Sequence, residues 1–414
     1  MPQQNRRLGV VVLGSDFKGL GVIRSLGQRG IPCVLIDNLP RSAWFSRYVT
    51  KRFKWDGPLN TDDFLQFLLN IGEEHHFIGW VLFPVQDDAV EFVAHHTSQL
   101  ATSYCLVTQN WDVVRWAHDK RLTYRMAHEV GMPYPKTWYP DTEEQLKTLV
   151  ITFPVIIKPA ISIHLQHALR LKALPVHTMD ELLKQYHLVA DIIHPQEIMI
   201  QEIIPGDGRT QYAVGTFCKN GQVLQSITVR RTRQYPIDYG LGSSFVEAIE
   251  VPAITQLAEK LLRMMGLSGM VEVEFKYDAR DEQYKLLDIN PRPWGWHTLC
   301  IQCGLDLPYI QYCDALGHEI AAPTKPYYGR RWIRLLTDIP AGLQEIRVGI
   351  TTPTAYVHSL LGKTTFSVFA WHDPLPALGD LGVALSRLAK MLPQKLHAAE
   401  KLHTTEPSQC STGT

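Results

Sequence analysis

The sequence predicts an α/β domain followed by an α+β region, and two patterns support this assignment. Residues 8–37 read as a buried strand, a helix closed by glycine and a second buried strand, which together form a βαβ unit. Beyond residue 150, short apolar strands, a hairpin and separate helices are mixed instead of alternating regularly. At 414 residues the chain is too long for one ordinary core, so we expect two or three lobes.

The N-terminal α/β domain is expected over residues 1–112. Its first two strands are LGVVVLG (8–14) and IPCVLID (31–37). A further helix and a strand–turn–helix segment, GWVLFPVQDDAVEFVAHH (79–96), follow them. Strands that alternate with helices in this way predict a mostly parallel sheet.

The rest of the chain is expected to form a second domain and an extension. Short strands at FPVIIKPA (153–160) and EIMIQEII (197–204) precede a hairpin that turns at Asn220-Gly221 and a helix over 252–265. The expected boundaries are 113–324 for the second domain, about 136–204 for its small lobe, about 205–324 for its large lobe, 325–393 for a C-terminal α/β extension and 394–414 for a disordered tail.

Charge and cysteine content exclude several classes of protein. The 41 basic and 41 acidic residues give a net charge of zero, which argues against a nucleic-acid-binding protein. Seven scattered cysteines do not form the pattern of a disulfide framework. The apolar run at 8–13 is too short for a signal peptide or a membrane span. We therefore expect a reduced, cytoplasmic protein.

The segment GMVEVEFKYDARDEQYKLLDIN (269–290) predicts a hairpin rich in acids. It reads as a strand at 270–277, a polar turn and a strand at 284–290. Side chains two residues apart share one face of a strand, so each of these strands carries a polar pair on one face.

The two polar pairs are expected to meet across the hairpin. If the turn centres near Asp281, Glu274 lies opposite Asp288 and Glu272 lies opposite Asn290. Opposed carboxylates repel, and a divalent cation between them is the simplest remedy. Oxygen-only ligands suit Mg²⁺ or Mn²⁺, and Asn290 adds a neutral oxygen. A solvated strand face, or a register shifted by one residue, is the alternative.

An arginine follows the hairpin at the point where the second strand ends. Pro291 breaks the strand, and Arg292 comes directly after it. The planar guanidinium of Arg292 is suited to binding a phosphate or a carboxylate through two parallel hydrogen bonds.

KLLDINPRP, preceded by VEVEFKYD, resembles the metal-binding hairpin of ATP-grasp ligases, which usually ends in Glu-x-Asn-x-Arg. Asp288 stands where the family usually has Glu, and Asn290 and Arg292 match the pattern. The resemblance implies Glu274 as the upstream metal ligand, with Glu272 as the second choice. It implies a Rossmann-like pre-ATP-grasp domain followed by a two-lobed ATP-grasp fold.

Other landmarks follow in the order of the family. HDKRLTYRMAHEVGMPYPKTW resembles the segment with the first ATP-binding lysine, Lys120, and FPVIIKPA the strand with the second, Lys158. IMIQEIIPGDG resembles the hinge strand that holds adenine, and Asp207 is the nearest acid for the ribose. The implied hinge residues are Gln201, Glu202, Ile203 and Ile204.

The opening segment and HDPLPAL resemble carboxylate–amine ligases of this superfamily, the same broad group as D-aspartate ligase. The implied activity is phosphorylation of a carboxylate by ATP, with Mg²⁺ or Mn²⁺, to an acyl phosphate that an amine then attacks. The implied partners are a small carboxylic acid, an amine and, as in many relatives, a second copy of the chain. Lys158 and Arg292 would neutralise charge during transfer.

SITVRRTRQYP adds two further arginines to the candidate catalytic residues. Arg231 and Arg233 are expected to share a strand face and to bind a substrate carboxylate or the γ-phosphate. A solvated basic edge strand is the alternative.

Two observations keep other functions open. The segment after Lys158, AISIHLQHALRLKA, lacks the usual glycine-rich loop over the phosphates, which would suit a homologue that binds a nucleotide or metabolite without catalysis. Gly19, Gly21 and Asp37 partly match a dinucleotide fingerprint, although Arg24 occupies the third glycine position. An NAD(P)-dependent oxidoreductase is therefore the other alternative.

Overall fold

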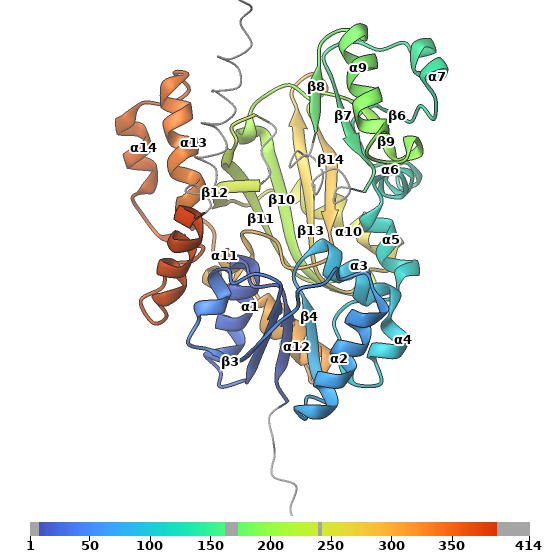
Figure 1. The fold of residues 1–414 in the computed structure, drawn as a ribbon. Coiled ribbons are helices and arrows are strands. Elements are labelled where there is room, and N and C mark those ends of the chain that lie inside the picture. Colours follow the sequence, from blue (N-terminus) through green and yellow to red (C-terminus); the bar gives the residue numbers. More distant parts are fainter. Residues whose placement is uncertain (1–7, 162–172, 239–241, 321, 387–414) are drawn as a thin grey trace, which may run out of the picture.

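The computed structural model describes residues 8–161, 173–238, 242–320 and 322–386, and the statements below concern these residues (Figure 1). Three sheets of five, seven and four strands organise the chain. The predicted combination of an α/β domain with an α+β region is confirmed. No helix in the described ranges is long and apolar enough to cross a membrane.

The N-terminal sheet is parallel, as the sequence predicts. Its order is β3-β2-β1-β4-β5, and each neighbouring pair runs in the same direction. Every residue of β1 is buried, which is typical of a strand covered on both faces by helices. Its strands are β1 (Val10–Leu13), β2 (Cys33–Asp37), β3 (Val49–Lys54), β4 (Trp80–Pro84) and β5 (Tyr104–Leu106).

Most helices of this domain begin with a side-chain cap or with acidic residues in the first turn. The Asp16 carboxylate accepts hydrogen bonds from the N–H groups of Lys18 and Gly19, which fixes the start of α1 (Phe17–Gly27). The other helices of this region are α2 (Asp62–Glu74), α3 (Asp87–His95), α4 (Thr97–Leu100) and α5 (Trp111–His118), with the 3₁₀ turn η1 (Ser42–Phe45).

The central sheet has the order β14-β13-β10-β11-β12-β15-β16 and is mostly antiparallel. Asn220 and Gly221 both have positive φ, which makes the tight hairpin turn between β10 and β11 that the sequence predicts. The strands are β10 (Gln211–Lys219), β11 (Gln222–Tyr235), β12 (Gly242–Ala248), β13 (Gly269–Asp278), β14 (Gln283–Asn290), β15 (Arg331–Ile333) and β16 (Thr364–Phe366).

The small sheet, β6-β9-β7-β8, lies at the far end of the molecule from β3 (Figure 1). Its strands are β6 (Thr137–Trp138), β7 (Val155–Pro159), β8 (Leu174–Val176) and β9 (Ile198–Glu202). Further helical elements are α6 (Lys120–Glu129), α7 (Glu143–Thr148), α9 (Met179–Ala190), α10 (Pro252–Met265), α11 (His297–Gln302), α12 (Leu307–Ala315), α13 (Leu335–Arg347), α14 (Pro353–Leu360), η2 (Pro195–Glu197) and η3 (Gly208–Thr210), and residues 375–386 are also helical.

One hydrophobic core joins the N-terminal domain to the central sheet. Val10 of β1 and Phe217 of β10 are both fully buried in the same apolar cluster, together with Trp294. The carboxyl ends of the parallel strands therefore abut the face of the central sheet that carries Glu272, Glu274, Asp288 and Asn290, as the contacts below show.

Buried ion pairs attach the C-terminal extension to both neighbours. Arg233 of β11 donates to both oxygens of Asp338 on α13 at 2.9 Å, and the two side chains are 4% and 0% exposed. Asp373, in the segment HDPLPAL, accepts from Arg24 of α1 and from Ser46. These contacts hold the extension against the sheet and the N-terminal domain.

Loss of one partner of the Arg233–Asp338 pair should strongly destabilise the protein. Asp338→Ala leaves a buried guanidinium uncompensated, which typically costs about 3–5 kcal/mol of unfolding free energy. Arg230→Ala removes a more exposed ion pair, the one between Arg230 of β11 and Glu247 of β12. This change should cost only about 0–1 kcal/mol. Urea denaturation measures both, and equal effects would contradict this ranking.

Candidate functional site

The acidic hairpin has the predicted register. Glu274 lies opposite Asp288, and Glu272 lies opposite Asn290, in the antiparallel pair of β13 and β14. All four side chains therefore lie on one face of the central sheet. A bulge follows Glu274, so the register shifts only beyond the polar set.

Cations from other parts of the chain surround these acids. The Lys120 ammonium donates to Asp288 Oδ1 at 2.8 Å, and Arg231 Nη2 donates to Glu274 Oε2 at 3.1 Å. Burial alone would lower the pKa of Lys120, but the Asp288 carboxylate raises it above its ordinary value. The ammonium is thus held charged between α6 and β14.

Arg292 lies between the hairpin and the N-terminal domain. Its guanidinium donates to Asn290 Oδ1 at 3.0 Å and forms a double hydrogen bond with Asp87, the first residue of α3. Burial would raise the pKa of Asp87, but the Arg292 guanidinium holds it well below the usual range. The arginine therefore remains charged at the site.

Glu272 orients the amide of Asn290. The amide N–H₂ donates to Glu272 Oε2 at 3.0 Å and to Glu274 Oε1 at 3.2 Å, so its carbonyl oxygen points away from both acids. The indole of Trp296 donates to the other Glu272 oxygen at 2.6 Å. Burial, with the nearby Glu274 charge, raises the pKa of Glu272 to about 8. Both oxygens of Glu272 therefore already accept hydrogen bonds within the protein.

The two predicted lysines lie close together. The backbone N–H of Lys120 donates to the carbonyl of Ala160, just past the end of β7, and this brings α6 to the strand of Lys158. The Lys158 ammonium donates to the hydroxyl of Tyr124 at 3.1 Å, and that hydroxyl donates to the Leu287 carbonyl. Burial and the neighbouring Lys120 charge lower the pKa of Lys158 to about 7.

The predicted hinge residues occupy the end of β9 and the loop after it. Gln201 is buried and its amide donates to Thr137 on β6, whereas Glu202 accepts from the Lys136 N–H and from Arg280. Ile203 and Ile204 lead from the small sheet toward the central sheet.

Asp207 lies just past the hinge and is engaged within the protein. It caps η3 and pairs with Arg209 at 2.6 Å, and its side chain is 47% exposed. Arg209 in turn contacts Glu345 of α13.

The prediction that Arg231 and Arg233 share a face is wrong. A bulge in β11 places Arg231 opposite Val246 and Arg233 opposite Phe245. Because consecutive residues of β12 point to opposite faces, the two arginines do so as well. Arg231 reaches Glu274, whereas Arg233 is committed to Asp338.

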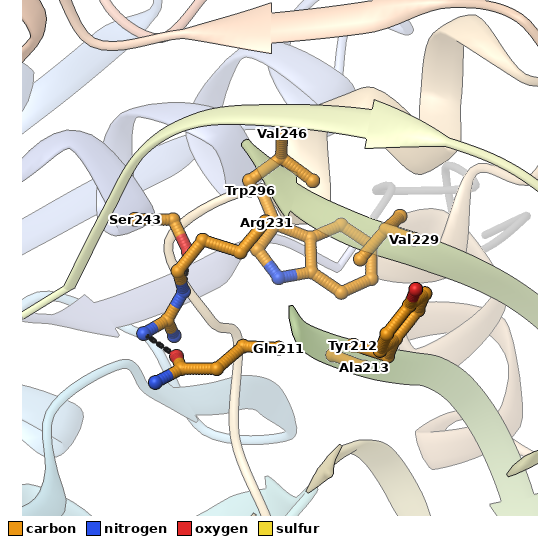
Figure 2. Close-up of a pocket in the computed structure, with 8 residues that line it drawn as sticks. All are labelled: Gln211, Tyr212, Ala213, Val229, Arg231, Ser243, Val246 and Trp296. Atoms are coloured by element: carbon orange, nitrogen blue, oxygen red, sulfur yellow. Dashed lines mark hydrogen bonds between the residues drawn. The ribbon is translucent and has the colours of Figure 1, made fainter. Parts of the chain in front are cut away.

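A small pocket on the central sheet is lined in part by Arg231, the partner of Glu274 (Figure 2). The Trp296 ring lies in the middle of its lining, with Arg231 on one side and Val229 on the other (Figure 2). Its lining residues are Gln211, Tyr212, Ala213, Val229, Arg231, Ser243, Val246 and Trp296.

Asp87 and Tyr124 are functional candidates that sequence reasoning missed. Asp87 lies just after β4, and the rule that residues after parallel strands face a cleft could have found it. Tyr124 lies one helical turn after Lys120 on α6, but nothing in the sequence indicates that its hydroxyl reaches Lys158. Ser162, His164, His167 and Lys172, the polar residues of the glycine-free segment after Lys158, lie outside the described residues.

The oxygen set on β13 and β14 fits a magnesium ion. The described ranges contain no cluster of three or more His, Cys, Asp or Glu side chains that could hold a metal alone. Two carboxylates and an amide oxygen form an incomplete ligand set, which suits Mg²⁺ because it usually keeps waters and shares phosphate oxygens. Glu274, Asp288 and Asn290 would hold it, once the amide of Asn290 turned so that its oxygen, which here accepts from Arg292, joined the two carboxylates.

A known protein family matches the part of the chain that contains the acidic hairpin. Residues 194–334 match the family described as "ATP-grasp in the biosynthetic pathway with Ter operon". D-aspartate ligase from Enterococcus faecium is 24% identical over 306 residues, which are 70% of this chain and 72% of the relative. D-alanine–D-alanine ligase from Anaplasma marginale is 26% identical over 48% of this chain, which spans 62% of that relative.

Solved structures share the fold of this chain over about three quarters of its length. An L-amino acid ligase from Bacillus licheniformis matches with a TM-score of 0.58 and 14% identity over 77% of this chain and 76% of that chain. The biotin carboxylase domain dimer of 2-oxoglutarate carboxylase from Hydrogenobacter thermophilus, in complex with MgADP, ADP and bicarbonate, matches with a TM-score of 0.64 and 15% identity over 79% and 73%. The chain has the ATP-grasp fold.

The ATP-grasp fold explains why the candidate residues come from distant segments. Lys120 on α6 connects the two sheets, because its backbone N–H donates to Ala160, just past β7, and its ammonium donates to Asp288 on β14. The predicted resemblance to ATP-grasp carboxylate–amine ligases is confirmed.

The buried Lys158 should make stability depend on pH. Its pKa is about 7 in the folded protein against an ordinary value of 10.5, so the unfolded chain binds one more proton between these pH values. The unfolding free energy should therefore rise with pH across this window, relative to Lys158→Met. Denaturation of both proteins at pH 7 and pH 10 measures the difference, and parallel pH profiles would contradict it.

Proposed function

We propose that this chain is an ATP-dependent ligase that joins a carboxylate to an amine and releases ADP and phosphate. The observation that carries the proposal is the opposed pair Glu274–Asp288, surrounded by Lys120, Arg231 and Arg292. Paired acids with nearby cations are what phosphoryl transfer to a carboxylate requires, since the protein contributes mainly positioning and charge neutralisation.

In the first proposed step, a carboxylate oxygen attacks the γ-phosphorus of ATP and the bond to ADP breaks. A bound Mg²⁺ or Mn²⁺ would neutralise charge on the β- and γ-phosphate oxygens. Lys120 and Lys158 would bind the phosphates from the small-lobe side, and Arg292 would bind the transferred group from the other side. Gln201, Glu202, Ile203 and Ile204 would contact the adenine, and Asp207 the ribose.

In the second step, the amine nitrogen attacks the carbonyl carbon of the acyl phosphate. The C–O bond to phosphate breaks, and the departing phosphate or solvent takes the amine proton. Arg231, fixed beside Glu274, would stabilise the negative charge that develops on the carbonyl oxygen. No side chain is assigned as a general base, because an acyl phosphate is a strong electrophile.

The names of the relatives support this reaction class. D-aspartate ligase, D-alanine–D-alanine ligase and L-amino acid ligase all join amino acids, so we propose an amino acid or similar acid as the activated substrate. An oxidoreductase is not favoured, because the Asp37 carboxylate accepts hydrogen bonds from the N–H groups of Ser15, Asn38 and Leu39. The Asp37 carboxylate therefore stabilises the backbone of these loops and is not directed at a ribose.

The experiment that tests the function is a screen for ADP formation. Pairs of carboxylic acids and amines are added with ATP and Mg²⁺, and mass spectrometry identifies the product. A homologue that only binds nucleotide would be stabilised by it, but it would release no ADP with any pair of acid and amine.

Asp288→Asn and Lys158→Ala should each lower acid-dependent ADP release by at least about 100-fold, as expected for loss of charge stabilisation during transfer. Each removes a charge that would contact the metal or the phosphates. Asp112→Asn, at a site 83% exposed, is the control and should keep full activity. Full activity of either site variant would remove that residue from the mechanism.

We also propose that two copies of the chain associate through the C-terminal extension. Fourteen of the 24 exposed large apolar residues in the described ranges lie between Leu335 and Leu385. In this stretch only Arg347 and Lys363 are exposed among Asp, Glu, Lys and Arg. Apolar surface with few charges is typical of an interface core, and a two-fold axis would bring two such surfaces together without repulsion.

Sedimentation should therefore show a dimer that Ile339→Glu with Leu343→Glu converts to monomer, because buried carboxylates would oppose association. Leu188→Glu, at an exposed apolar position of α9, is the control and should leave the dimer intact. A monomeric parent protein, or a dimer that survives the double change, would contradict this interface.

A further inference from the structure

We propose that the turn end of the acidic hairpin positions the hinge for adenine, through the side chains of Lys276, Arg280 and Lys285. These three are positioning residues within the proposed ligase function, on which this assignment rests: they hold the hinge and do not touch the nucleotide. Recognition of the base then depends on the same hairpin that carries the proposed metal ligands.

A set of cations lies on the same face of the hairpin as the acids, nearer to the turn. Lys276 lies two residues beyond Glu274 on β13, so both side chains lie on one face of that strand. Lys285 lies directly opposite Lys276 across the ladder, beyond the bulge. Two opposed ammonium groups repel each other, as opposed carboxylates do. The turn end of this face is therefore positive, and its cations need oxygen partners.

The hinge and the loop after it supply several of these oxygens. The Lys276 ammonium donates to the carbonyl of Gly206 at 2.7 Å, and Arg280 Nη2 donates to Glu202 Oε2 at 3.0 Å. The Lys285 ammonium lies 3.7 Å from Glu202 Oε1. The hairpin thus holds the chain at both ends of the segment that leads from the small sheet to the central sheet.

A buried carboxylate fixes two of the cations. Asp278 is fully buried, and its carboxylate accepts from Nε and Nη2 of Arg280 and, at 2.6 Å, from Lys285. Because both cations are already ordered, they hold Glu202 without a further loss of side-chain freedom. An isolated surface ion pair contributes little, whereas these pairs belong to one network with a buried centre.

These contacts determine which atoms of Glu202 remain for a ligand. Its Oε1 accepts from the Lys136 N–H at 2.9 Å and its Oε2 accepts from Arg280, so the carboxylate faces the hairpin. The hinge therefore offers adenine its backbone groups. Adenine presents an amino donor where guanine presents a carbonyl acceptor, so a backbone group fixed in one position distinguishes the two bases.

One hairpin then sets both ends of the proposed nucleotide site. Glu274 and Lys276 are two residues apart, which is about 7 Å along a strand. Because both side chains belong to one paired strand, the proposed metal ligands and the hinge contact keep a constant separation. Loss of the contacts at the turn should loosen the hinge and leave the metal ligands in place.

The test compares two ligands that share a phosphate chain and differ in the base. Isothermal titration calorimetry measures the Kd of MgADP and of magnesium tripolyphosphate, which has no base. Arg280→Ala should raise the Kd of MgADP by about 10-fold, because binding must then order the hinge. The Kd of magnesium tripolyphosphate should stay at the parent value. Arg280→Lys keeps the charge and should restore part of the affinity for MgADP.

A double variant tests whether Arg280 acts through Glu202. Once Glu202→Gln has removed the carboxylate, Arg280→Ala should add little to the Kd of MgADP, because the two changes remove the same contact. Arg230→Ala is the matched control: its pair with Glu247 is 42% and 22% exposed, against 48% and 21% for Arg280 and Glu202. This control should keep the parent Kd for both ligands.

The outcomes separate this inference from the proposed function. A parent protein that binds MgADP but releases no ADP with any acid and amine would overturn the ligase function, and the Kd values would still decide the positioning role. A parent that does not bind MgADP would overturn both. If Arg280→Ala binds MgADP like the parent, weakens both ligands equally, or adds its full effect to Glu202→Gln, the positioning role alone is overturned.

Discussion

Two carboxylates held opposite each other across one strand ladder constrain the rest of this structure. Glu274 and Asp288 repel each other, and the backbone pairing of β13 and β14 prevents them from separating. The chain offsets the repulsion with Lys120 from α6 and Arg231 from β11, while Arg292 holds the adjacent Asn290. Since these cations come from distant segments, the acidic hairpin determines which elements gather around it.

This balance of charge also indicates how the carboxylates and the cations of the site can exchange one another for a metal ion and a phosphate. Each of the three cations is bound to a protein oxygen in the structure, so the site is electrically satisfied without a ligand. In the proposed function, a nucleotide with its metal ion exchanges these pairs: the metal takes the carboxylates and the phosphates take the cations. Lys158 differs from the others, because burial and Lys120 favour its neutral form and an incoming phosphate would favour its charged form.

Local rules of strand geometry were sufficient to predict the hairpin. They did not predict contacts between residues that are far apart in the sequence. The alternation of side chains and the turn near Asp281 were sufficient to pair Glu274 with Asp288. The place of Arg233 was missed because a β-bulge reverses the side-chain alternation and leaves no clear mark in the sequence. Asp87 and Arg292 are 205 residues apart, and no local pattern encodes such a contact. The pocket beside Arg231 was likewise hidden, since three separate strands and the Trp296 loop build it.

The most direct test of the central claim is a crystal structure with Mn²⁺ and a nonhydrolysable ATP analogue, examined by anomalous scattering. We expect a manganese peak between Glu274 and Asp288, with triphosphate oxygens completing its shell and with Lys120 and Lys158 turned toward the phosphates. A map with no peak there, in which Asp288 still pairs with Lys120 and Glu274 with Arg231, would contradict it.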